Sequence, residues 1–261
     1  MRACAFDQLA STYDATFTDT AIGRTLRDIV WTRLRATFGP TQRVLELGCG
    51  TGEDAVCLAG LGARVVATDP SPAMIEVARR KAEARSCTGR IEFHCLPMEN
   101  LASLADGPFD GVLSNFGAVN CAQDLPCLVR QVAGQLVPGG SLVWVVMGRY
   151  APWEWAWYSL RGQWRKAWRR LNRNGVEWRG LTLSYPSPGR MSALLRPYFA
   201  VKRLAPLGIA LPPSYAASWL NRWPRIASVL TRLEWSAQRS RALAWWSDHY
   251  IIEATRLDVP A

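Results

Sequence analysis

The sequence lacks several features that mark membrane, secreted or disulfide-bonded chains. The longest apolar run, at Leu142–Met147, is far too short to cross a bilayer. The N-terminus carries Asp7 and Asp14 and has no apolar core, so we expect no signal peptide. Seven cysteines are scattered without close pairs, which is typical of a reducing compartment rather than of a disulfide framework. These absences predict a cytoplasmic protein.

What is present divides into two unlike parts. The 261 residues are 49% hydrophobic and 20% charged, which excludes a disordered or collagen-like chain. Residues 1–148 hold 13 Lys+Arg and 15 Asp+Glu, whereas residues 149–261 hold 18 and 6. Tryptophan is divided likewise, because 11 of the 13 follow residue 149. We therefore expect an ordinary α/β part followed by a basic, Trp-rich part.

Short β-type runs alternate with helical patterns through the first part. This alternation predicts right-handed βαβ units and a doubly wound, Rossmann-like, largely parallel sheet. Such a sheet binds ligands at the carboxyl ends of its strands, where the strand order reverses. The predicted strands are 43–47, 63–68, 91–95, 109–113 and 141–147. Helices are expected at 53–61, after an N-cap at Ser71, and at 125–136.

Three glycines follow the first predicted strand at alternate positions, Gly48, Gly50 and Gly52. They permit a tight strand-to-helix turn that a ligand can approach closely. Glu46 ends that strand and would repel a pyrophosphate, but it suits a ligand with an ammonium group. Asp69 ends the second strand, where a carboxylate accepts hydrogen bonds from both ribose hydroxyls. The pattern disfavours NAD and favours S-adenosylmethionine.

With these residues, the segment of roughly 6–148 resembles the class I S-adenosylmethionine-dependent methyltransferases. It is most similar to the branch that includes quinone C-methyltransferases and the methyl-ester-forming enzyme of biotin synthesis. The resemblance implies S-adenosylmethionine as methyl donor, S-adenosylhomocysteine as product, and a seven-stranded sheet. Strands six and seven must then come from the second part, best at 199–203 and 250–256.

The resemblance also implies the residues that surround the cofactor. We expect no metal site. Val44–Gly52 resembles the family's first motif, and the segment from Phe6 to Asp14 resembles the N-terminal cover of the cofactor. The implied cofactor-binding residues are Tyr13, Glu46, Gly48, Gly50, Gly52, Asp69, Met74, Met98, Glu99, Ser114 and Asn115.

Two motifs of nucleic-acid methyltransferases are missing or out of place. Pro126-Cys127 resembles the nucleophile motif of RNA cytosine-5 enzymes, but it opens a helix behind Asp124 instead of following the fourth strand. Ser114-Asn115-Phe116 stands where amino-group methyltransferases carry an Asn/Asp-Pro-Pro-aromatic motif. Nucleic acid is therefore not the favoured partner.

We divide the chain into a cofactor-binding core, 1–148, and a second part, 149–261. The latter contains a substrate-cap insertion at about 150–195 and the last strands. From Pro152 to Leu171, six Trp and Leu residues recur every three or four positions, which predicts one long helix with an apolar face and a basic face. This helix suits a cap over an apolar pocket, an anionic membrane surface or nucleic acid. We favour the cap and keep peripheral membrane contact open.

The sequence leaves the acceptor and the catalytic residues open. Methyl transfer is an in-line displacement in which positioning and exclusion of water supply most of the acceleration. Candidate bases are His249 beside Asp248, Tyr150 and Asn120. We expect a small, largely apolar acceptor that is anionic or membrane-associated. The alternatives are an RNA or protein methyltransferase docking through the basic part, and a cofactor-binding protein without catalysis. The oligomeric state is not predicted.

Overall fold

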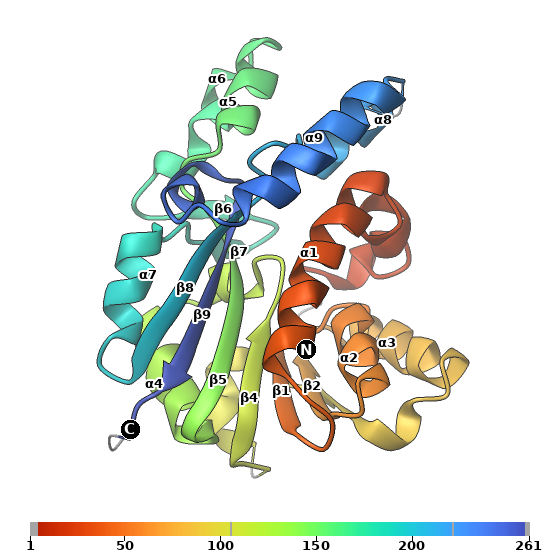
Figure 1. Ribbon diagram of the computed structural model, residues 1–261, viewed down its shortest axis with the longest axis vertical. Coiled ribbons are helices and arrows are strands. Elements are labelled where there is room, and N and C mark those ends of the chain that lie inside the picture. The colour runs from red at the N-terminus through yellow and green to blue at the C-terminus, as the bar shows by residue number, and fades with distance from the viewer. Residues whose placement is uncertain (1–4, 105, 221, 259–261) are drawn as a thin grey trace.

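The computed structural model describes residues 5–104, 106–220 and 222–258. A seven-stranded sheet runs through the molecule in the order β3-β2-β1-β4-β5-β9-β8, with helices on both faces (Figure 1). Its strands are β1 (Arg43–Leu47), β2 (Arg64–Asp69), β3 (Ile91–Cys95), β4 (Phe109–Ser114), β5 (Leu136–Met147), β8 (Phe199–Leu207) and β9 (His249–Arg256). The predicted α/β fold with a doubly wound, mostly parallel sheet is confirmed, including its two strands from the second part of the chain.

The last two strands join the second part to the first. β9 lies between β5 and β8 and pairs antiparallel with both, so that Ile251 is opposite Val145 on one side and Ala205 on the other. The order of the parallel strands reverses between β1 and β4, which is where a doubly wound sheet opens a crevice for a ligand.

Neighbouring residues of the strands point into two separate apolar clusters, one on each face of the sheet. Val44 packs with α1 (Ala21–Thr37) and α2 (Glu53–Gly60), whereas Leu45 packs with α4 (Leu125–Gln135) and α7 (Pro188–Leu195) on the other face. Because both faces of the sheet are covered, its strands consist of nearly continuous runs of apolar residues. The remaining elements of this core are α3 (Pro72–Ala84), η1 (Asp7–Leu9), η2 (Asp14–Thr18), η3 (Thr88–Arg90), η4 (Met98–Ser103) and η5 (Ala118–Cys121).

The N-caps that the sequence predicts for two of these helices are present. The Ser71 side chain accepts a hydrogen bond from the Met74 backbone N–H at 3.1 Å, and Asp124 accepts one from Cys127 at 2.9 Å. Each cap precedes a proline in the first turn, where the missing N–H costs nothing.

The second part places its other elements beyond the carboxyl ends of the parallel strands (Figure 1). No described helix has both the length and the hydropathy needed to cross a membrane. These elements are α5 (Pro152–Ser159), α6 (Trp164–Ala167), η6 (Arg169–Leu171), a hairpin of β6 (Val176–Trp178) and β7 (Leu181–Leu183), η7 (Ser214–Ala216), α8 (Ala217–Leu220), α9 (Pro224–Ala237) and η8 (Ala242–Trp246).

The single long helix expected from Pro152 to Leu171 is wrong, because the chain breaks into α5, α6 and η6. Gly162 adopts a left-handed φ of 68° and ends α5. The backbone N–H of Gln163 bonds to the carbonyl of Tyr158, and that of Gly162 to Ser159, which is the glycine-terminated end of a helix. The helical spacing of tryptophans is present in the sequence, but the glycine inside it stops the helix.

Buried ion pairs attach α5 and η6 to the start of β9. The fully buried carboxylate of Glu154 contacts Arg169 at 2.7 Å and Arg170 at 2.5 Å. Arg170 also contacts Asp248 at 2.7 Å, and Asp248 lies 2.9 Å from Nδ1 of His249. Burial alone would raise the pKa of Asp248, but the Arg170 guanidinium and the His249 ring outweigh it and hold the pKa below its ordinary value.

Because of these ion pairs, we expect the free energy of unfolding to depend on pH in the acidic range. Because the pKa of Asp248 is lower in the folded chain than in the unfolded chain, its contribution is present above the ordinary carboxyl pKa of 3.8 and is lost as the pH falls below it. We expect the free energy of unfolding, measured with urea between pH 7 and pH 3, to fall in this range. Asp248→Ala should lower it by about 3–5 kcal/mol at pH 7, since Arg170 loses a buried partner.

The Asp248→Asn variant should lose less unfolding free energy between pH 7 and pH 3 than the wild type does. Asp28→Asn, at an exposed position on α1, should lose as much as the wild type. A loss of the wild-type size in Asp248→Asn would contradict this assignment.

Candidate cofactor and acceptor site

A cavity of about 490 Å³ lies at the carboxyl ends of β1, β2 and β4. It opens at the point where the strand order reverses, as the fold predicts. Of the eleven residues expected around the cofactor, eight line it: Tyr13, Gly48, Gly50, Asp69, Met74, Met98, Glu99 and Asn115.

The three glycines after β1 have left-handed backbones, with φ of 70°, 53° and 79° at Gly48, Gly50 and Gly52. A Cβ on Gly48 would lie 2.3 Å from the Ala118 side chain, and one on Gly52 would lie 2.8 Å from that of Ala78. A Cβ on Gly50 would meet nothing within 4 Å. Two glycines therefore allow close packing, and Gly50 borders open space that a ligand can fill.

Asp69 is held ready for a ligand at the end of β2. One carboxylate oxygen accepts the backbone N–H of Gly50 at 2.9 Å, and the other accepts that of Ser71 at 2.9 Å. Burial raises the pKa of Asp69 to about 6, although these two N–H bonds act to lower it. The carboxylate keeps lone pairs free to accept hydrogen bonds from the two hydroxyls of a ribose.

Glu46 lies buried beneath the glycine turn and does not line the cavity. Its Oε2 has no hydrogen-bond partner among the described residues. Burial and the neighbouring charge of Asp54 raise the pKa of Glu46 well above its ordinary value. A buried carboxylate without a cation of its own is the group that a positively charged ligand would compensate. Together with Asp69 and the open space at Gly50, this fits S-adenosylmethionine, which carries an ammonium, a sulfonium and a ribose.

Asp54 joins three elements around this turn. It lies in the first turn of α2 and forms a 2.8 Å ion pair with Arg27 of α1. It also accepts hydrogen bonds from the Trp31 indole at 2.7 Å and from the Asn115 amide at 2.8 Å. The Asn115 side chain thereby fixes the loop that follows β4, and Asn115 itself lines the cavity.

The N-terminal segment covers the cavity and is fixed at two acids. Asp14 accepts hydrogen bonds from Thr51 and from Lys81, both at 2.7 Å. Asp7 accepts a hydrogen bond from the Ser71 hydroxyl at 2.5 Å, at the start of α3. Tyr13, between them, lines the cavity, and burial raises its pKa to about 12.

Much of the cavity lining is apolar and includes residues of the hairpin of β6 and β7. The Trp178 ring of this hairpin lies 5.2 Å from the Phe6 ring of the N-terminal segment. Leu181 and Leu183 of β7 and Met147 of β5 also line the cavity.

Sequence reasoning missed this hairpin. Its signal is present, since two short runs with alternating apolar residues flank Arg179-Gly180, and both turn residues have left-handed φ of 50° and 80°. That geometry is typical of a two-residue hairpin turn with glycine in second place.

Three predicted cofactor residues lie outside the lining. Besides Glu46, these are Gly52, which packs against α3, and Ser114. The buried Ser114 hydroxyl donates to the Leu47 carbonyl at 2.9 Å and so ties β4 to β1.

The three candidate catalytic residues are also not among the residues that line the cavity. The Asn120 amide donates to the carbonyls of Met147 and Ser184, and its oxygen accepts the Met147 N–H at 2.8 Å, so its hydrogen bonds are used within the protein. The Tyr150 ring packs 5.4 Å from that of Trp246. The His249 ring packs edge-on against the cavity residue Phe116, with the ring centres 5.8 Å apart.

The carboxylate of Asp69 leads to a prediction on cofactor affinity. The ribose hydroxyls donate to the ionised form, so affinity for S-adenosylhomocysteine should be constant above pH 7 and fall below pH 6, close to the pKa of about 6. Asp69→Asn should weaken binding about 10- to 100-fold at pH 8, the range for hydrogen bonds to a charged group, and remove the step near pH 6.

Titration calorimetry between pH 5 and pH 8 measures both effects. Glu83→Gln, at an exposed acid of α3, is the matched control and should bind as the wild type does. A step near pH 6 that persists in Asp69→Asn would mean that another group titrates.

Comparison with known proteins finds similarity to methyltransferases. Residues 44–140 match the family model described as a methyltransferase domain. The demethylmenaquinone methyltransferase of Clavibacter sepedonicus is 35% identical over 142 residues, 53% of this chain and 54% of that protein. The tRNA 5-carboxymethoxyuridine methyltransferase of Escherichia coli is 30% identical, over 52% and 54%. The chain thus spans about half the length of these curated relatives.

The fold of the whole chain resembles solved methyltransferases. The CcbJ methyltransferase of Streptomyces caelestis superposes with a TM-score of 0.64 at 17% identity, covering 98% of each chain. The family match begins at β1 and contains the glycine turn, Asp69 and the strands around the cavity. Residues 44–140 thus match a methyltransferase domain, and the whole chain has the fold of solved methyltransferases.

Proposed function

We propose that this protein transfers a methyl group from S-adenosylmethionine to a small, largely apolar acceptor. The observation that carries the proposal is the apolar lining that Phe116, Met147 and the β6–β7 hairpin contribute, which we assign to the acceptor end of the cavity. Among the described lining residues, Asp69 and Glu99 alone are charged. An apolar acceptor gains from burial there, whereas a charged group would lose its hydration without a partner.

The protein's residues would mainly position the two reactants and exclude water. When bound, the cofactor supplies the electrophilic methyl group. Asp69 orients the ribose, and the unpaired Glu46 carboxylate compensates the positive charge of the cofactor. The Trp178 and Phe6 rings cover the acceptor end and keep water out.

The acceptor end favours a nucleophile that needs little help from a base. Asp69 and Glu99 are the only carboxylates in the described lining of the cavity, and this lining contains no histidine or lysine. The pKa of Tyr13, raised by burial to about 12, makes that phenol a poor proton acceptor at neutral pH. We therefore propose that the acceptor ionises easily by itself or reacts at carbon. His249 keeps a positioning role in this proposal, because it supports Phe116 from behind.

Two observations bear on the acceptor class. Relatives named demethylmenaquinone methyltransferase and ubiquinone biosynthesis O-methyltransferase match 53% and 41% of this chain, and their names support an apolar, membrane-associated acceptor. A relative named tRNA 5-carboxymethoxyuridine methyltransferase and the basic second part favour RNA as the second candidate. The apolar lining of the cavity supports the first candidate.

Transfer of label tests the proposal directly. Purified protein is incubated with methyl-labelled S-adenosylmethionine and an extract divided into organic-soluble, RNA and protein fractions. We expect label in the organic-soluble fraction, with none from Asp69→Ala. Label confined to RNA or protein would contradict the apolar acceptor, and binding of the cofactor without any labelled product would contradict catalysis.

The hairpin should affect methyl transfer to the acceptor but not the affinity for the cofactor. Trp178→Ala opens the apolar end, so label transfer to the organic fraction should fall about 10-fold or more, given that burial of a large apolar side chain is worth about 1.5–3 kcal/mol. Calorimetric affinity for S-adenosylhomocysteine should change less than twofold. Thr182→Ala, at an exposed position on β7, is the matched control. An equal loss in both variants would show that the hairpin does not contact the acceptor.

A further inference from the structure

The helix α9 presents an apolar stripe to solvent. Ile226, Val229 and Leu233 are 42%, 53% and 53% exposed, and their spacing of three and four residues places them on one side of the helix. This stripe is distinct from the buried side, where Leu230 packs on the core and Glu234 is fully buried. An exposed apolar stripe on a well-anchored helix indicates an interaction surface.

The anchor of α9 is the Glu234 carboxylate. It accepts the backbone N–H groups of Gly208 and Ala210, both at 2.8 Å, and that of Leu211 at 3.1 Å, in the loop after β8. These bonds fix the rotation of the helix about its own axis. The apolar stripe therefore cannot turn inward without breaking a buried, fully used carboxylate.

Arginines flank the stripe at regular intervals. Arg225 and Arg232 are both exposed on α9 and lie seven residues apart, which is close to two helical turns and places them along one edge of the stripe. Arg239, also exposed, follows the end of the helix. Between residues 222 and 247, the chain contains no acid except the buried Glu234. The outer surface of this segment is therefore apolar and positive, without negative charge.

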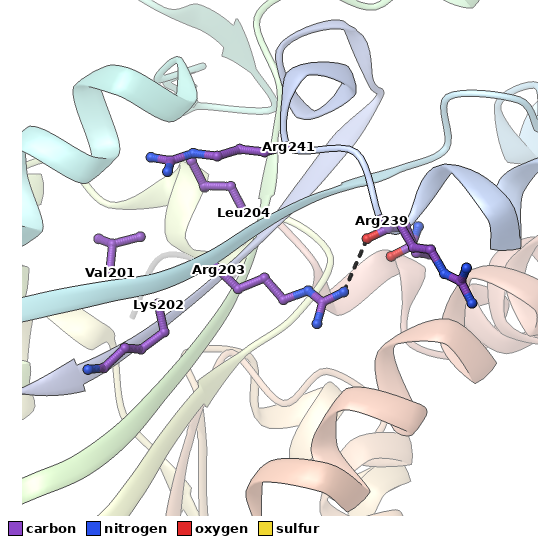
Figure 2. Close-up of a pocket in the computed structure, with 7 residues that line it drawn as sticks. Val201, Lys202, Arg203, Leu204, Arg239 and Arg241 are labelled. Carbon is purple, nitrogen blue, oxygen red and sulfur yellow. Dashed lines mark hydrogen bonds between the residues drawn. The ribbon is translucent and has the colours of Figure 1, made fainter.

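The positive charge continues past the end of α9 to the edge strand β8. A shallow pocket there is lined by Lys202, Arg203, Arg239 and Arg241. Figure 2 shows the side chains of Lys202 and Arg241 extending away from those of Arg203 and Arg239, instead of converging on one point. Arg203 donates to the backbone carbonyl of Gln238 at 3.3 Å. Such splayed cations form a broad positive field rather than a site for one small anion.

A second exposed apolar group lies at the same end of the molecule. Leu160, Trp164 and Trp168, on α5, α6 and the turns beside them, are 86%, 60% and 44% exposed. Arg161 and Arg165 are exposed among them. Figure 1 shows α5, α6 and α9 all extending beyond the carboxyl ends of the parallel strands.

We propose that the exposed stripe of α9 and its flanking arginines bind the surface of an anionic phospholipid bilayer. Aliphatic side chains enter the boundary between headgroups and acyl chains, tryptophan prefers the same region, and arginine contacts anionic headgroups. The chemistry disfavours other occupants. Ile, Val and Leu do not stack on bases as an RNA surface requires, and a second copy of this chain would bring the same positive charge against itself.

The α9 surface is connected to the cover of the cavity. The segment η7, which precedes α8 and α9, packs against η2, and η2 directly follows Tyr13 of the cavity lining. Binding at α9 would therefore hold the N-terminal cover next to the membrane. This inference concerns where the protein binds and does not depend on the proposed acceptor.

Sedimentation with vesicles tests the inference. The full chain is mixed with phosphatidylcholine vesicles containing 0% or about 30% phosphatidylglycerol. We expect binding to the anionic vesicles, weak binding to the neutral ones, and partial release in 0.5 M NaCl because salt screens the arginines but not the apolar stripe. The double variant Arg225→Gln/Arg232→Gln should bind about 25-fold more weakly, at roughly fivefold for each arginine.

Further variants separate the contribution of the apolar stripe from that of net charge. Val229→Ser/Leu233→Ser should lose at least 10-fold in binding without a loss of folding, since both side chains are already exposed. Arg80→Gln/Arg85→Gln on and beside α3 removes the same net charge from another exposed surface and should bind as the wild type does. Affinity for S-adenosylhomocysteine should be unchanged in all variants, so failure here is distinguishable from failure of the methyltransferase proposal.

Three outcomes would overturn the inference. The first is equal vesicle binding by wild type and both α9 variants. The second is binding to single-stranded RNA, abolished by the α9 variants, without binding to anionic vesicles. The third is a concentration-dependent dimer, seen by light scattering, that the Val229→Ser/Leu233→Ser variant abolishes while vesicle binding stays unchanged.

Discussion

The cavity depends on the ion pair and hydrogen bonds of the buried Asp54 carboxylate. A charge taken out of water must be paired and hydrogen-bonded, and Asp54 meets this requirement by drawing in Arg27, Trp31 and Asn115. These partners belong to a helix on one face of the sheet and to the loop after β4. The glycine turn lies between them. One electrostatic requirement thus fixes both the turn that would receive the cofactor and the wall beside it.

The same electrostatics explain why this site suits a cationic ligand. Glu46, Asp54 and Asp69 all lie buried near the turn, and the buried cation Arg27 forms its ion pair with Asp54. Their mutual repulsion, added to burial, raises the pKa of Glu46. A ligand with positive charge would relieve it, whereas a pyrophosphate would add to it. The chain carries a net positive charge overall, yet its cofactor end is locally negative, because the cations of the second part lie elsewhere.

The second part uses buried acids to anchor elements whose outer surfaces are basic. Glu154 fixes α5 and η6 through Arg169 and Arg170, and Glu234 fixes α9 through three backbone N–H groups. Two of the few acids of this part are therefore used inside, and most of its arginines are exposed. The arrangement gives rigid attachment to the sheet and leaves an exposed face of arginine, tryptophan and aliphatic side chains.

The sequence by itself determined the sheet, the glycine turn, Asp69 and the two N-caps, because each depends on local periodicity or on a few adjacent residues. It even contained the signals for the break at Gly162 and the turn at Arg179-Gly180. Only the tertiary structure decided which residues face the cavity. Asn120 and Ser114 are polar residues at the right edge of the sheet, yet backbone groups distant in sequence use their hydrogen bonds. The exposure of the α9 stripe was decided in the same way, because Glu234 finds its partners 23 to 26 residues away.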